Sequence, residues 1–294
     1  MQRISILAGG AVLAGAMLGR APTAGAQTDA SIVWSGRMSD GSILTVRNIS
    51  GAINVVEATG DRVEVRATKR ARAGRDPSEL TFDVRDGASA TTICAVYRGE
   101  NACEDGRFRN MRIDADLTIS MPRSLRLRAS TGNGRLSVDK AGSDVDVSTG
   151  NGEITIGQTE GRVSASSGNG NVEIESAKGP VHVSSGNGRI FVSTSEGPVS
   201  ASTGNGDIDV RMRALSTAAD MEFSSGSGTI RVTLPSEFNG ELEASTGNGE
   251  LRSDFEIQIR GRLDPQHMRG TIGRGGRLIR LTTGNGRIEI RKGS

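Results

Sequence analysis

The chain of 294 residues has few of the residue types that build metal and sugar-stacking sites. It contains two cysteines and two histidines, and aromatic residues make up only 3% of it. Two cysteines without clustered histidines cannot supply the four ligands of a structural zinc site. We therefore expect no bound metal, and few aromatic rings are present to stack on sugars.

Long hydrophobic runs are scarce too, and the one at the start of the chain is short and rich in Gly and Ala. It follows Arg3 and ends near Ala24-Gly25-Ala26, which is typical of a secretory signal peptide over residues 1–26, cleaved after Ala26. An uncleaved anchor would need about 18 strongly apolar residues. We therefore expect an exported protein, periplasmic, on the cell surface or secreted, that is not integral to a membrane after cleavage.

The chain also lacks an excess of charge of one sign. Cleavage would remove Arg3 and Arg20 and no acid, which lowers 36 basic residues to 34 and equals the 34 acidic ones. Nucleic-acid binding is usually accompanied by a basic surplus gathered on one face. We therefore expect no nucleic-acid partner, and basic runs such as residues 69–75 are interpreted as solvated strands and loops.

The two cysteines, Cys94 and Cys103, lie close together in the segment CAVYRGENAC. Export would place them in an oxidising compartment, so we predict a disulfide between them. Closing so short a loop stabilises a fold by about 2 to 3 kcal/mol on the chain-entropy estimate.

What the chain has in abundance is glycine, with 41 residues, many of them in a repeated Gly-Asn-Gly motif. Seven copies have Asn at the centre, and an eighth copy has Ser227 there instead. The first five copies are 18 residues apart, and a fixed period of this kind indicates a repeat architecture. The motif centres are Asn133, Asn151, Asn169, Asn187, Asn205, Asn248 and Asn285.

A second period of nine residues lies inside the period of eighteen. Apolar residues recur at Ile154, Val163, Val172, Val181 and Ile190, and again two positions after each of these. Alternation of apolar and polar residues predicts a strand with one buried face. The fold class we predict is all-β: a single-domain β-solenoid with two short strands in each coil of roughly 18 residues, stacked at about 4.8 Å.

In this fold the Gly-Asn-Gly motif marks one corner of each coil. Glycine, and to a lesser extent asparagine, tolerates positive φ, and asparagine amides at one corner can hydrogen-bond along the stack. We predict that the seven asparagines form a structural turn ladder. The Ser/Thr pairs that precede the motif, such as Ser166-Ser167, are expected to form a parallel hydroxyl ladder.

The repeat also suggests where the solenoid begins and ends. We expect an N-terminal linker at 27–40 and a solenoid domain at 41–292, with an irregular insertion at about 70–112. Residues 211–223 are expected to form a longer turn that stretches one coil to 22 residues. The late coils are atypically spaced, as expected where an exposed end needs cover.

Rival interpretations of the glycines lack the residues that they need. A phosphate-binding loop needs Lys-Ser/Thr after its last Gly or a helix that follows a strand. In a calcium-binding β-roll, Asp would stand where Ile154 is found. His182 and Glu173 are the pair best placed for acid–base chemistry, but we expect a solvated surface pair. We therefore expect no catalytic residues and no cofactor.

At this point the chain resembles a known family of bacterial β-strand-repeat proteins of unknown function, termed "putative adhesins". The resemblance rests on GAINVVEATGDRVEV, on DLTISMPRSLRLRASTGNG, on the Ser/Thr-Gly-Asn-Gly repeats, and on the closing SDFEI and GTIGRGGRLIRLTTGNGRIEI. It covers residues 41–292. It implies a β-solenoid with export or surface exposure, and it supplies no catalytic residues.

Two classes of function remain open at this stage. The first is a non-enzymatic adhesin-like or structural module that binds a component of the cell surface or envelope. The alternative is a β-helix protein that binds or cleaves carbohydrate.

Overall fold

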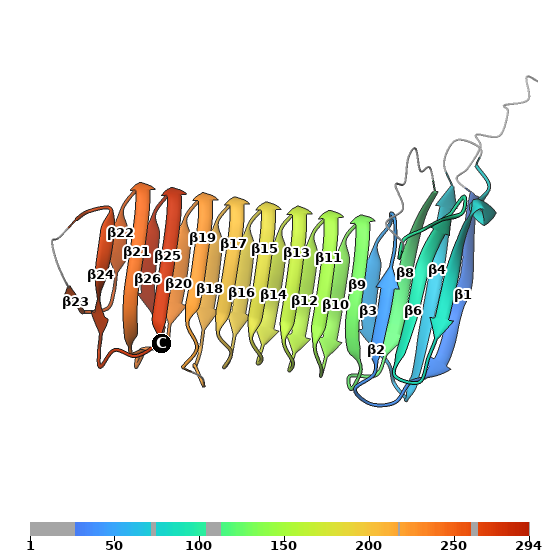
Figure 1. Ribbon diagram of the computed structural model, residues 1–294, viewed down its shortest axis with the longest axis horizontal. Helices are drawn as coiled ribbons and strands as arrows, with labels where there is room; N and C mark the ends of the chain where they lie inside the picture. Colours follow the sequence, from blue (N-terminus) through green and yellow to red (C-terminus); the bar gives the residue numbers. More distant parts are fainter. Residues whose placement is uncertain (1–26, 72–74, 104–112, 217, 260–263, 294) are drawn as a thin grey trace, which may run out of the picture.

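The computed structural model describes residues 27–71, 75–103, 113–216, 218–259 and 264–293. The fold is a β-solenoid made of two long sheets, and Figure 1 shows their strands side by side along one axis. The helical content of the described residues is one short 3-10 turn, η1 (Pro77–Glu79). The predicted fold class is confirmed.

One sheet, called sheet A, contains twelve strands. In spatial order they are β1 (Gln27–Arg37), β4 (Arg62–Ala71), β8 (Ile113–Met121), β3 (Ile53–Glu57), β10 (Leu136–Ala141), β12 (Ile154–Thr159), β14 (Val172–Ala177), β16 (Ile190–Thr194), β18 (Ile208–Met212), β20 (Ile230–Leu234), β26 (Ile288–Lys292) and β22 (Leu251–Ser253).

The other sheet, sheet B, contains fourteen strands, of which β7 (Glu100–Asn101) pairs only with β6 and lies off the main order. In spatial order the other thirteen are β23 (Ile257–Ile259), β24 (His267–Ile272), β21 (Gly240–Asn248), β25 (Leu278–Asn285), β19 (Met221–Ser227), β17 (Val199–Asn205), β15 (Val181–Asn187), β13 (Val163–Asn169), β11 (Val145–Asn151), β9 (Arg126–Asn133), β2 (Ile43–Arg47), β6 (Ala90–Tyr97) and β5 (Leu80–Asp86).

The nine-residue period places alternate strands in opposite sheets. Strand β12 pairs in parallel with β14, whereas the intervening β13 pairs with β11 and β15. The alternating apolar residues point inward from both sheets, so that Ile154, Ile156, Val163 and Ala165 are all buried in one core. The core is a narrow strip between the sheets, which explains why the composition favours Val, Ile and Ala over aromatic residues.

The stacking of coils leaves no room for side chains at the corner glycines. A Cβ added to Gly150 would lie 2.5 Å from the carbonyl oxygen of Gly132, one coil earlier. The structure bears out one part of the expectation for this motif and corrects another. The second glycine has a positive φ, between 151° and 158°, at Gly152, Gly170, Gly188, Gly206, Gly228 and Gly286. The asparagines do not, since Arg98 is the one non-glycine among the described residues with positive φ. Close approach of backbones and the positive φ of the second glycine therefore both explain the motif.

The N-terminal end differs from the expected linker and irregular insertion. Residues 27–37 form β1, which pairs antiparallel with β4, and β4 pairs antiparallel with β8. Within 70–112, the described strands β5 and β6 form an antiparallel pair, and β6 lies parallel to β2. These strands cover what would otherwise be open sheet edges, so the segment adds cover to the end of the solenoid.

The C-terminal end departs from sequential stacking. The last coil, β25 and β26, lies between the coil of β19 and β20 and the coil of β21 and β22. Figure 1 shows this coil, in red, among orange strands. Asn285 is therefore an internal residue of the stack rather than its end. Strands β24 and β23 then close sheet B by antiparallel pairing.

Replacing Gly150 with Ala tests the steric requirement at the corner. The added methyl group meets the backbone of the preceding coil, so we expect the free energy of unfolding to fall by about 1 to 3 kcal/mol, as for other overpacked sites. Chemical denaturation would measure the change. Gly60 is the matched control, because a Cβ there has no atom within 4 Å, and a loss at Gly60→Ala as large as at Gly150→Ala would contradict the explanation.

Candidate functional site

The corner asparagines lie in register on adjacent strands of sheet B. The side chain of Asn151 donates to Asn133, Asn169 donates to Asn151, and Asn187 donates to Asn169, each over 2.8 Å. Asn205 continues this series. Ser227 stands next in the row, and beyond it Asn248 donates to Asn285.

The Ser/Thr pairs before each Gly-Asn-Gly point to opposite sides of sheet B. The second member is buried and bonds to a glycine carbonyl of the preceding coil, as Ser167 does to Gly152 over 2.9 Å. The first member faces outward, and Ser184 donates to Ser166 over 3.1 Å. The inner hydroxyl therefore bonds to the backbone of the preceding coil. The outer hydroxyls of Ser184 and Ser166 bond to each other.

The outward hydroxyls form one continuous row across sheet B, which we call the hydroxyl row. Its members occupy one register position on eight adjacent strands: Ser130, Ser148, Ser166, Ser184, Ser202, Ser224, Thr282 and Ser245.

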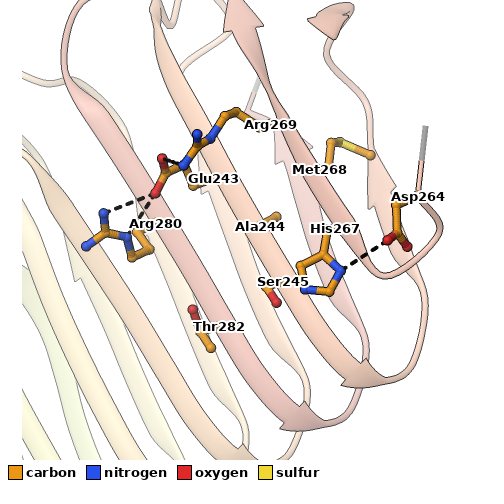
Figure 2. A pocket seen from close by; sticks show the side chains of 9 residues that line it. All are labelled: Glu243, Ala244, Ser245, Asp264, His267, Met268, Arg269, Arg280 and Thr282. Atoms are coloured by element: carbon orange, nitrogen blue, oxygen red, sulfur yellow. Dashed lines mark hydrogen bonds and ion pairs between the residues drawn. The ribbon is translucent and has the colours of Figure 1, made fainter. Parts of the chain in front are cut away.

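The hydroxyl row ends in a surface groove of about 520 Å³, here called the C-terminal groove. Figure 2 shows Ser245 and Thr282 on its floor, with His267 beside Ser245. Antiparallel pairing of β21 with β24 places Ser245 opposite His267. The His267 ring nitrogen Nδ1 lies 3.4 Å from a carboxylate oxygen of Asp264.

The acids of this groove are held in their charged form. Glu243 binds Arg280 over 3.0 Å and also pairs with Arg269. The hydrogen bond from Arg280 is the largest cause that lowers the pKa of Glu243. The pKa of Asp264 is lowered chiefly by the backbone N–H of Gln266, and His267 adds to this.

Although Ser, His and Asp meet in the C-terminal groove, their geometry is not that of an acyl-transfer triad. A triad needs the serine hydroxyl hydrogen-bonded to the imidazole, and no such bond joins Ser245 and His267 among the described contacts. The side chains of His267 and Asp264 are 64% and 52% exposed, so water is not excluded. The arrangement offers hydroxyls and charges for binding a ligand.

The outward face of sheet A is different, because it carries alternating charges. Asp209, Arg231 and Glu289 lie side by side on β18, β20 and β26. Arg231 lies 3.5 Å from Asp209 and 3.0 Å from Glu289. The two carboxylates are only 5% and 10% exposed. We call these three residues the charged row.

Sequence reasoning missed the charged row because it assumed sequential stacking. Glu289 is 58 residues from Arg231, and only the insertion of the last coil brings them together. Sequence reasoning had instead singled out His182 with Glu173. These two lie on β15 in sheet B and β14 in sheet A, and both point outward, so they are on opposite faces of the solenoid.

The cysteines are joined as a disulfide near the N-terminal end. Cys94 lies on β6, Cys103 follows β7, and their Cα atoms are 5.7 Å apart. The bond closes the loop over the tight turn at Arg98, whose φ is 52°. It ties β6 to the segment after β7 at the end of the solenoid where sheet B is extended.

Replacing Asn169 with Val tests whether the asparagine ladder stabilises the fold. Asn169 makes two ladder bonds, whereas Asn248 makes one at the end of its row. At about 1 kcal/mol per bond, we expect Asn169→Val to cost roughly twice as much stability as Asn248→Val. Thermal unfolding would compare them, and two neutral variants would show that the ladder is not structural.

The charged row predicts a loss of stability in acid. Burial alone would raise the pKa of Glu289, but hydrogen bonds and charges of Arg231, Arg291 and Arg287 lower it overall. A lowered pKa stabilises the fold above the ordinary value of 4.5, and this contribution is lost as the pH falls through the lowered pKa. Glu289→Gln should therefore be less stable than the unmodified protein at pH 7, and the difference should shrink below pH 4.5 in denaturation curves.

Comparison with known proteins finds similar solved structures and one matching sequence family. Solved structures that resemble it include a "putative adhesin" from Bacteroides fragilis NCTC 9343, with 12% identity, a TM-score of 0.49, and coverage of 90% of this chain and 97% of that one. Another, from Parabacteroides merdae ATCC 43184, has 11% identity, a TM-score of 0.49, and coverage of 90% and 96%. No curated protein matches. Residues 42–291 match the family Toastrack DUF4097, and the chain therefore belongs to this family of unknown function.

Proposed function

We propose that the protein is an exported, non-catalytic binding module that attaches to a component of the cell surface or envelope. The observation that carries this proposal is the hydroxyl row, in which eight adjacent strands present the same kind of side chain at one register position. Parallel strands lie about 4.8 Å apart. The row is thus a rigid, regularly spaced array of donors and acceptors.

Rigidity favours binding because little conformational entropy is lost when a partner attaches. The strands of the row are fixed by backbone pairing on both sides, and their inner hydroxyls bond to the preceding coil, as Ser185 does to Gly170. A repetitive partner can then contact several equivalent positions at once, and such multivalency raises overall affinity without any strong single contact.

Export is supported by two features. The first is the signal-like segment at residues 1–26, which lies outside the described residues. The second is the Cys94–Cys103 disulfide, because disulfides persist in oxidising compartments and are rare in the cytosol.

Among the described residues, no helix is long and apolar enough to cross a membrane. We propose the domain limits 1–26 for the signal peptide and 41–292 for the solenoid, with strand β1 before it.

Blocking the hydroxyl row should weaken attachment. We expect Ser166→Gln with Ser202→Gln to weaken binding of the purified protein to an envelope fraction by roughly ten-fold, about 1.4 kcal/mol, because the longer side chains fill the row without adding charge. Thr118→Gln with Thr155→Gln is the matched control, since both residues face outward from sheet A.

A hydrolysis screen against polysaccharides completes the test. Unchanged envelope binding in the Ser166/Ser202 variant would rule out the hydroxyl row as the attachment surface. Turnover of any polysaccharide would overturn the non-catalytic assignment, and surface proteolysis of intact cells would establish whether the protein is exported.

A further inference from the structure

The outward face of sheet A contains a second groove, larger than the first, with a volume of about 780 Å³. We call it the arginine groove. Its cationic side chains are Arg211, Arg213, Arg231, Arg291 and Lys292, and Glu175 is the one carboxylate in its lining. It lies beside the charged row, on the face of the solenoid opposite the hydroxyl row.

The groove crosses the strands rather than following one of them. Its lining begins at Glu175 on β14 and continues over β16, β18 and β20 to Lys292 on β26. These five strands are consecutive neighbours in sheet A. At about 4.8 Å per strand, the groove extends for roughly 19 Å along the solenoid axis, a shape that suits an extended polymer better than a compact ion.

Buried carboxylates hold the arginines in place and leave their guanidinium groups facing solvent. Asp209 lies 3.7 Å from Arg211, and Glu289 lies 2.7 Å from Arg291. The two acids are 5% and 10% exposed, whereas Arg211 and Arg291 are 61% and 51% exposed. The cations are therefore pre-positioned at the surface, which lowers the entropic cost of binding an anion.

Two further cations in the groove have no ionic partner among the described residues. Neither Arg213 nor Lys292 forms an ion pair within the part of the chain that the structure describes, and both are exposed. Lys292 lies over the ring of Phe255 at 5.2 Å from its centroid. Counting Asp209, Glu289 and Glu175 against the five lining cations leaves an excess of positive charge.

The aromatic content of the groove argues against single-stranded nucleic acid. Such ligands depend on bases stacked on open aromatic faces. The one aromatic residue in the lining is Phe191, and the guanidinium of Arg211 lies over its ring at 5.2 Å from the centroid. A polymer that carries anions and hydroxyls but needs no stacking platform suits these side chains better.

From the groove's length, charge and lack of an open aromatic face, we propose that the arginine groove binds a linear acidic polysaccharide through its carboxylate or sulfate groups. This inference rests on the proposed binding role, and it assigns a separate face and a ligand class to it. Carboxylates and sulfates would pair with the exposed guanidinium groups, and the chain of the polymer would follow the solenoid axis.

Charge reversal at the two unpaired cations provides the test. We expect the mature protein to bind polygalacturonate or heparin, to bind neutral dextran far more weakly, and to lose affinity as salt rises. Arg213→Glu with Lys292→Glu should raise the Kd by about ten-fold or more. Since neither side chain is in an ion pair of the described chain and the exposed Lys292–Phe255 contact contributes only modestly, the variant should unfold only slightly below the temperature of the unmodified protein.

The matched control is Arg47→Glu with Arg126→Glu, which changes the net charge equally on the exposed face of sheet B. Equal weakening by the control variant would overturn the site, and so would equal binding of dextran. Binding to an oligothymidylate or to anionic vesicles without binding to either acidic polysaccharide would overturn the ligand class. Unchanged envelope binding in the Ser166/Ser202 variant would bear on the proposed function alone, because the polysaccharide assay uses purified components and a different face of the solenoid.

Discussion

The contact on which the rest of this structure depends is the approach of one backbone corner to the next. At each Gly-Asn-Gly the chain passes so close to the preceding coil that hydrogen is the largest substituent that fits on the glycine Cα. That proximity lets the asparagine amides reach each other and lets the inner hydroxyls reach a carbonyl. It also holds the strands in one register, so each strand repeats the side-chain pattern of its neighbour.

Fixed register gives the two faces of the solenoid different chemistry. In sheet B the outward position before the corner is a hydroxyl on strand after strand, whereas in sheet A the corresponding outward positions vary and carry charges. Because neighbouring strands are in register, the outward residues at one position of each repeat form a continuous row across the sheet. The hydroxyl row is neutral and uniform, and the charged row is concentrated where the last coil is inserted.

Much of this fold could be predicted from the sequence because its signals are local and periodic. The spacing of Ile154, Val163 and Val172 is enough to place alternate strands in two sheets. The longer turn expected at 211–223 falls at the connection between β18 and β19, but it is shorter, because β18 ends at Met212 and β19 begins at Met221. The position of the last coil could not be predicted, since Asn248 and Asn285 lie in equivalent motifs that offer the same pairing to β19. Which of the two motifs pairs with β19 depends on how the residues between them fold at the end of the solenoid, and the repeat period does not predict this.

The same limitation explains which parts of the candidate sites were found. Asn133 to Asn205 and the two cysteines could be identified because their partners are one repeat or one short loop away. Arg231 and Glu289, like Ser245 and His267, meet only through pairing of distant strands. Neither pair has a spacing that a motif search would recognise.

The internal position of β25 and β26 bears on the order in which the coils can assemble. Residues 278–292 are synthesised after β21 and β22, yet they form a layer between that coil and the coil of β19 and β20. Folding therefore cannot simply add one coil after another in the order of the sequence. The coil of β21 and β22 cannot pair with its final neighbours until residues 278–292 have been made, as expected where a non-local pairing contributes to the fold. A repeat protein can in this way depend on a pairing that skips one of its own coils.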